Sequence, residues 1–198
     1  MLRWVPVVAL GGCNLALNAV KPSVLDTGAD STPTDPEATD LILSEIVEGP
    51  GDRKFVEIYN GTGKRVQLDN YELRRYANGN DTANDVFQLD GQTIEDGETL
   101  VITPNAEVFF GEFGELADRE DQVAQGDGND AYALVYTSGG AEEIVDVYGE
   151  IGVDGTGTRW EYTQSAVRRL PDVLQGRENF RFNEWEFHAW DDASPKAR

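Results

Sequence analysis

From residue 41 onward, the chain consists of short apolar segments, many of which alternate apolar with polar residues. Alternation with a period of two is typical of half-buried β-strands. Turns such as "EGPGD", "NGTG" and "GDGND" separate these segments, and their Gly, Asn and Asp residues favour tight turns. The pattern predicts strands at residues 41–47, 54–60, 71–76, 86–89, 99–103, 132–136, 143–148, 166–170 and 181–187.

One stretch favours a helix instead of a strand. "PNAEVFFGEF" begins at Pro104, and glycine keeps the helix short. Strands that recur at a spacing of roughly 10 residues, without long helices between them, indicate an antiparallel sandwich or barrel. We therefore predict a single all-β domain.

Residues of equal parity along a strand lie on one face of the sheet. In "KFVEIY" and "YELRRY" this rule separates apolar from charged positions. Glu57 and Arg74 then point outward, Glu57 toward solvent, and the two side chains meet across a ladder if their strands pair. We predict that four apolar side chains form the inner face: Val56, Ile58, Tyr71 and Leu73.

Two aromatic residues share the outward parity of Glu57, namely Phe55 and Tyr59. They form a candidate binding stripe. Alternatively, the aromatic C-terminal segment "FRFNEWEFHAW" covers them. Within that segment, we predict that Trp185 and Phe187 lie on the inner face of a closing strand, where buried aromatic rings add stability.

The charge of the chain is strongly negative. Its 198 residues carry 37 Asp and Glu against 16 Lys and Arg, which gives a net charge of −21. Such a field repels nucleic-acid phosphates, so we predict no nucleic-acid partner. Excess acid also favours solubility, which is the simpler explanation of the composition and needs no cationic ligand.

The N-terminal stretch "MLRWVPVVALGGCN" places one basic residue before an apolar run, small residues and the only cysteine. It resembles a bacterial lipoprotein signal, which implies cleavage before Cys13, lipidation of Cys13 and a membrane partner through that anchor. Asn14 stands where many inner-membrane lipoproteins have Asp, so the resemblance implies an exported protein of the cell envelope, at the outer membrane. The alternative is an ordinary buried N-terminal element with a chance cysteine.

From Pro22 to Thr39 the chain is rich in Asp, Thr, Ser, Pro and Ala and lacks periodic apolar residues. Such a composition cannot bury enough apolar surface to fold and suits a solvated tether. We therefore predict four parts of the chain: a signal peptide at 1–12, a tether at 13–39, a β-sandwich at 40–190 and a tail at 191–198.

Two kinds of chemistry are candidates for a site. His188, the only histidine, lies among aromatic residues, and the sequence contains no Walker loop, dinucleotide fingerprint or nucleophile elbow. A carboxylate pair of the glycosidase kind stays open, because many acids are present. Calcium prefers several oxygen ligands from one compact loop, although such a loop also makes ordinary turns. The candidate calcium ligands are Asp118, Asp121, Asp127, Asn129 and Asp130.

Several motifs recur in an order that resembles one family. They are "LILSEIV", "KFVEIYNGTGKRVQLDNYELRRYANG", "GETLVITPNA", "GDGNDAYALVY" and "EIVDVYGEIG", followed by Arg168 and by Asn183 to Trp185. Over residues 41–188 the chain resembles the lamin tail domain family in its bacterial form. The resemblance implies an immunoglobulin-like antiparallel β-sandwich.

The sequence favours a non-catalytic, lipid-anchored envelope module that binds a protein or glycan partner, supports adhesion or organises the envelope. We expect no enzymatic activity and no cofactor other than the candidate calcium. The alternative function is an accessory or degenerate domain associated with secreted hydrolases, because bacterial lamin tail domains often accompany such enzymes on one chain.

Overall fold

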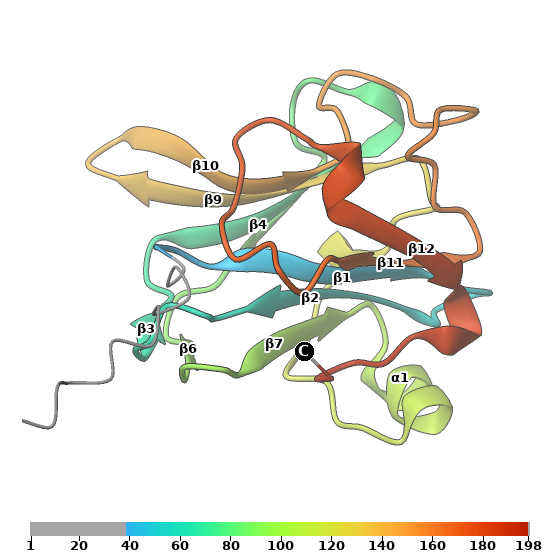
Figure 1. Cartoon of the computed structure of the whole chain (residues 1–198), viewed down its shortest axis with the longest axis horizontal. Coiled ribbons are helices and arrows are strands. Elements are labelled where there is room, and N and C mark those ends of the chain that lie inside the picture. The colour runs from blue at the N-terminus through green and yellow to red at the C-terminus, as the bar shows by residue number, and fades with distance from the viewer. Residues whose placement is uncertain (1–38, 198) are drawn as a thin grey trace, which may run out of the picture. The chain divides into compact units, whose positions relative to one another are not determined.

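Two β-sheets face each other in residues 39–197, the part of the chain that the computed structural model describes (Figure 1). The larger sheet pairs its strands in the order β12 (Trp185–Ala189), β11 (Ser165–Arg169), β1 (Ile42–Glu48), β2 (Lys54–Tyr59), β7 (Thr99–Thr103) and β8 (Arg119–Glu120). The smaller sheet has the order β10 (Ala141–Tyr148), β9 (Ala131–Ser138), β4 (Tyr71–Tyr76) and β5 (Asp85–Gln88). Two short strands, β3 (Val66–Gln67) and β6 (Thr93–Ile94), form a separate ladder. The paired strands run antiparallel except β7 and β8, so the predicted antiparallel sandwich is confirmed.

Each predicted strand has a counterpart in the structure, with ends that differ by a few residues. The largest shift is in the last strand, because Phe182–Glu184 forms a 3₁₀ turn (η3) before β12 begins. The other 3₁₀ turns of the described residues are η1 (Ala77–Gly79), η2 (Gln122–Ala124) and η4 (Trp190–Asp192). None of the helices in residues 39–197 is long and apolar enough to cross a membrane.

The predicted helix is also present, as α1 (Ala106–Phe113). It starts at Ala106 because the Asn105 side chain accepts a hydrogen bond from the backbone N–H of Val108 at 3.1 Å, which caps the helix. It ends at Gly114, whose φ of 72° is a left-handed conformation that glycine adopts at little cost. The glycine therefore limits the length of the helix, as predicted.

The main core lies between the two sheets, and it confirms the predicted inner face. Residues from both sheets form one buried cluster, in which large aromatic rings such as Tyr148 and Trp160 meet edge to face at 6.3 Å. All four side chains that parity assigned to the inner face belong to this cluster: Val56, Ile58, Tyr71 and Leu73. Alternation along single strands was sufficient to identify them.

Glu57 and Arg74 lie outside the main core as predicted, but they do not meet across a ladder, and the predicted exposure of Glu57 to solvent is wrong. β2 and β4 lie in different sheets, so these two strands do not pair. Arg74 instead contacts Glu72 at 2.6 Å and Glu142 at 2.8 Å. Glu57 is only 2% exposed, because other parts of the chain cover the outer face of the six-stranded sheet.

The same cover excludes a binding stripe at Phe55. This ring is 0% exposed and packs edge to face against Phe109 of α1 and against Phe113, with ring centroids 5.5 and 5.4 Å apart. Trp190 and Ala193 pack against the same apolar cluster, so the C-terminal segment supplies part of the cover. The stripe is therefore replaced by a second, smaller core between the outer sheet face, α1 and the C-terminal segment.

The C-terminal residues differ from the prediction in two ways. Trp185 is buried as expected, but Phe187 is 36% exposed. Phe187 shares the parity of Trp185 and lies opposite the core residue Val167, so it is on the inner face as predicted, and it meets solvent because β12 is the edge strand of the sheet. Residues 191–197 are not a free tail either. The backbone N–H groups of Ser194 and Lys196 bond to Glu45 and Glu57 on the outer sheet face.

A buried ion network joins the two sheets. Arg169 of β11 contacts Asp146 of β10 and, at 2.8 Å, Glu184. Asp146 also accepts hydrogen bonds from the backbone N–H groups of Leu43 and Arg177, at 2.8 and 2.9 Å. Because β10 and β11 belong to different sheets, this network fixes how one sheet lies on the other.

Candidate functional site

The candidate site begins with a β-bulge in β1. Leu43 lies opposite Ile58 and Glu45 lies opposite Glu57, so Ser44 is an extra residue on the β1 side. An extra residue reverses the parity of the strand that contains it. Leu43 and Ile46 consequently both enter the main core, and Glu45 points to the outer face beside Glu57.

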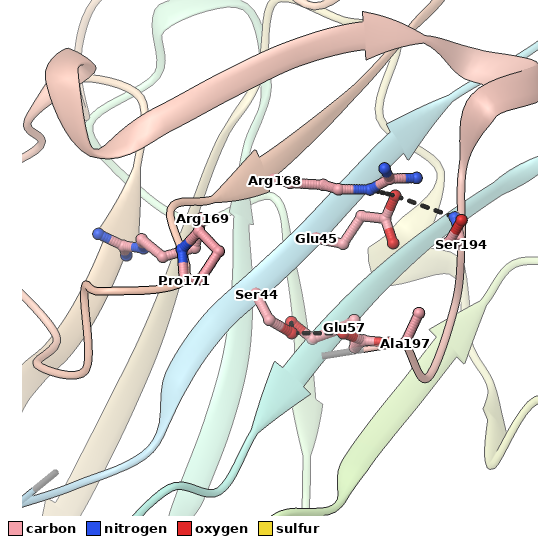
Figure 2. Close-up of a pocket in the computed structure, with 8 residues that line it drawn as sticks. All are labelled: Ser44, Glu45, Glu57, Arg168, Arg169, Pro171, Ser194 and Ala197. Atoms are coloured by element: carbon pink, nitrogen blue, oxygen red, sulfur yellow. Dashed lines mark hydrogen bonds and ion pairs between the residues drawn. The ribbon is translucent and has the colours of Figure 1, made fainter. Parts of the chain in front are cut away.

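A cleft of about 360 Å³ lies over this pair of glutamates (Figure 2). β1 and β2 supply the two acids, β11 supplies arginines, and the C-terminal segment forms one wall. The cleft is lined by Ser44, Glu45, Glu57, Arg168, Arg169, Pro171, Ser194 and Ala197. It therefore combines residues that lie far apart in the sequence.

Each glutamate of the cleft has a side-chain partner. The Ser44 hydroxyl donates a hydrogen bond of 2.6 Å to Oε1 of Glu57, and Nε of Arg168 donates one of 2.8 Å to Oε1 of Glu45. Figure 2 shows both contacts. Ser44, Glu45 and Glu57 are all buried, with exposed fractions of 3%, 3% and 2%.

Backbone N–H groups of the C-terminal segment also donate to the two acids. The N–H of Ser194 lies 3.3 Å from Oε1 of Glu45, and the N–H of Lys196 lies 2.6 Å from Oε2 of Glu57. The ammonium of Lys196 also forms an ion pair of 3.1 Å with Asp118. The site thus holds main-chain donors and a cation at the same time.

The electrostatics of the cleft favour such donors. Burial raises the pKa of Glu45 above its ordinary value, Arg168 opposes this shift, and the negative charge of Glu57 adds to it. A carboxylate that is buried beside another carboxylate is stabilised by any cation or N–H donor that enters. The cleft therefore suits a positively charged ligand better than an anion.

The candidate calcium ligands are not brought together. Asp118 accepts from the N–H of Val101 at 2.8 Å, Asp121 caps η2, and Asp130 is buried against Arg75 at 2.9 Å. Within residues 39–197, no group of three or more acidic, His or Cys side chains is placed to hold a metal ion. These residues are close to one another along the chain, but their side chains stabilise different elements.

The partners of the other two candidate ligands lead to the same conclusion. The amide of Asn129 donates to Thr156 at 3.0 Å and to Asn78 at 3.2 Å, which links three loops. Asp127 is exposed, and its backbone oxygen accepts from Thr163 at 3.4 Å. This loop is therefore a structural junction.

The remaining sequence candidates lie apart from the cleft. His188 lies on β12 opposite Ala166, with Nε2 at 3.7 Å from Glu186. Tyr59 is half-buried at the end of β2. The proposed lipidation residue, Cys13, lies outside the described residues.

Sequence reasoning missed the site itself, although one signal was present. In "LILSEIV" the apolar positions change parity between Leu43 and Ile46, which is the mark of a bulge. That signal predicts an outward Glu45. No local pattern places Arg168 or Ser194 beside it, because they come from the end of the chain.

Comparison with known proteins agrees with this architecture. The family model described as Lamin Tail Domain matches residues 34–152, which include β1 to β10. No curated protein and no solved structure matches the chain. β11 and β12 follow the matched region and are two of the six strands of the larger sheet. The chain belongs to the lamin tail domain family, and its fold is the immunoglobulin-like β-sandwich of that family.

Proposed function

We propose that this protein is a non-catalytic binding module that a lipid at Cys13 anchors in the bacterial cell envelope, at the outer membrane. The non-catalytic part of this proposal rests on the arginine contacts of four buried acids. Glu45, Asp130, Asp146 and Glu184 each contact an arginine, and these contacts stabilise the sandwich. Acids that hold strands and loops together in this way are poorly suited to proton transfer to a substrate.

The anchor is supported by the sequence around Cys13. Downstream of the box from Leu10 to Cys13, the polar stretch from Pro22 to Thr39 suits a solvated tether. Cleavage before Cys13 removes Arg3 and no acid, so the mature protein is more negative than −21. Because such a protein is repelled by anionic lipids, membrane retention has to come from acyl chains, and stable anchoring takes more than one.

Mass spectrometry of the native protein from its own host tests the anchor. We expect a mature N-terminus at Cys13 that carries acyl groups, and we expect the Cys13→Ala variant to leave the membrane fraction. A matched control is Asn14→Ala, which keeps the cysteine and should stay in the membrane fraction. An intact N-terminus, or a membrane fraction unchanged by Cys13→Ala, would contradict the anchor.

Activity assays test the non-catalytic part independently. We expect no turnover of nucleic acids, phosphate esters or common glycans by the purified protein, and a protein or glycan as the binding partner. The net charge of −21 argues against a nucleic-acid partner. Turnover that disappears in Glu45→Gln or Glu57→Gln would identify the cleft as an active site and contradict the proposal.

A further inference from the structure

We propose that the cleft over Glu45 and Glu57 is the docking site for a lysine-bearing segment of another protein, and that residues 193–197 occupy the site when no partner is bound. The inference rests on the proposed function as a binding module and names the chemistry of its partner. We refer to residues 193–197 as the strap.

The strap shows which groups the cleft recognises. Ser194 and Lys196 each donate a backbone N–H to one glutamate, and the residue between them, Pro195, has no N–H to place. The two acceptors come from neighbouring strands, because Glu45 and Glu57 face each other across the β1–β2 ladder. The cleft thus binds a main chain whose N–H donors are two residues apart. The lysine is the one side chain of the strap that an acid recognises by its charge.

The lysine is recognised by a third acid. Its ammonium lies 3.1 Å from Asp118, while its own backbone N–H bonds to Glu57. One residue therefore contacts two acids from different elements. Arg168 lies 2.8 Å from Glu45. A partner with positive charge is attracted by the acids of this region and by the overall charge of −21.

The strap is suited to leave the cleft. Lys196 has a φ of 62°, a left-handed conformation that is unfavourable for a residue with a side chain. Its ion pair with Asp118 is about one-third exposed on both sides, where solvent screens the attraction. A volume of about 360 Å³ also stays open beside the strap. A partner segment with a relaxed backbone can make the same bonds and fill this space.

A strap on the same chain competes strongly with a free ligand. A tethered segment acts at an effective concentration on the order of millimolar, so a peptide at micromolar concentration does not displace it from the intact chain. Opening of the strap should therefore reveal binding that the intact chain hides.

The test measures binding of a fluorescein-labelled peptide, Ala-Ser-Pro-Lys-Ala, by fluorescence anisotropy. It compares the full chain with the full-length Lys196→Glu variant, in which a negative charge faces Asp118, and with a chain that ends at Asp192. Ser194→Ala is the matched control, because it keeps both backbone N–H donors. We expect saturable binding to both opened forms, and binding roughly tenfold weaker or more to the full chain and to the control.

Two further measurements identify the contacts. A peptide with Glu in place of Lys, and the Glu45→Gln/Glu57→Gln variant of the opened chain, should each bind roughly tenfold more weakly, because a charge-assisted contact is lost. Equal affinity of the full and opened chains, or no saturable binding to the folded Lys196→Glu variant, would overturn the inference. Loss of membrane anchoring in Cys13→Ala leaves this binding unaffected, so failure of the anchor and failure of the cleft are separate results.

Discussion

The buried network around Arg169 allows a quantitative prediction. The perturbation is Arg169→Met, which keeps a side chain of similar length but removes the guanidinium. The guanidinium lies between Asp146 and Glu184, and it also lies over the ring of Trp185, 4.2 Å from its centroid. The side chains of Arg169 and Asp146 are 1% and 0% exposed, so water cannot replace the lost contact.

The expected magnitude follows from the acids that stay behind. Removal of one partner from a buried ion pair costs about 3–5 kcal/mol, since a buried charge is left uncompensated. Asp146 keeps its two backbone N–H donors at 2.8 and 2.9 Å, which offsets part of the loss. Loss of the cation–π contact with Trp185 adds roughly 1 kcal/mol to the destabilisation. We therefore expect a loss of about 4 kcal/mol, which lowers the melting temperature by about 10 °C for a domain of this size.

Urea unfolding followed by tryptophan fluorescence measures this difference. A double-mutant cycle adds Asp146→Asn and the double variant. We expect the double variant to lose about 1–3 kcal/mol less unfolding free energy than the sum of the two single variants. Arg181→Met is the control, because Arg181 is exposed and its replacement should change stability by less than about 0.5 kcal/mol. A loss below about 1 kcal/mol in Arg169→Met, or strictly additive losses, would refute the reasoning.

Three further predictions concern the cleft and the packing around it. Burial raises the pKa of Glu45 above 4.5 in the folded state, so its proton stabilises the fold below that pH and this stability is lost as the pH rises through the folded pKa. Glu45→Gln should flatten that decline in unfolding free energies measured by urea titration across the pH range, and unchanged slopes would contradict it. Gly128→Ala should destabilise the domain by roughly 2 kcal/mol or more, because φ is 98° and a Cβ would lie 2.5 Å from the backbone N of Thr163. Gly111→Ala in α1 meets open space and should stabilise the domain by about 0.5–1 kcal/mol. Equal melting temperatures of the two variants would contradict this packing. Phe55→Ala should lower the unfolding free energy measured by chemical denaturation by about 3–5 kcal/mol. A near-neutral result would favour the exposed binding stripe at Phe55 instead of the second core.

The sequence alone was sufficient for nine of the strands, the helix and the inner face, but it did not predict the two-residue strands β3, β6 and β8. The predicted elements are visible in the pattern of residues that are close along the chain. Alternation identified Val56 and Ile58 as core residues, and turn chemistry separated the strands. The order of the motifs then identified the family, which the match over residues 34–152 confirms. The lipid anchor at Cys13 is also a prediction of the sequence, and it lies outside the described residues.

Only the tertiary structure decided which strands pair and what covers each face. The parity of β2 does not reveal that Glu57 lies beside Glu45 rather than beside Arg74, because sheet order depends on contacts across the whole domain. Alternation likewise separates two faces of a strand without saying whether the second face meets solvent, a helix or a returning segment. Phe55 became core because α1 and the C-terminal segment pack on it. The cleft has the same origin: a one-residue bulge turned Glu45 outward, and residues about 120 to 150 positions further along the chain supplied Arg168 and Ser194.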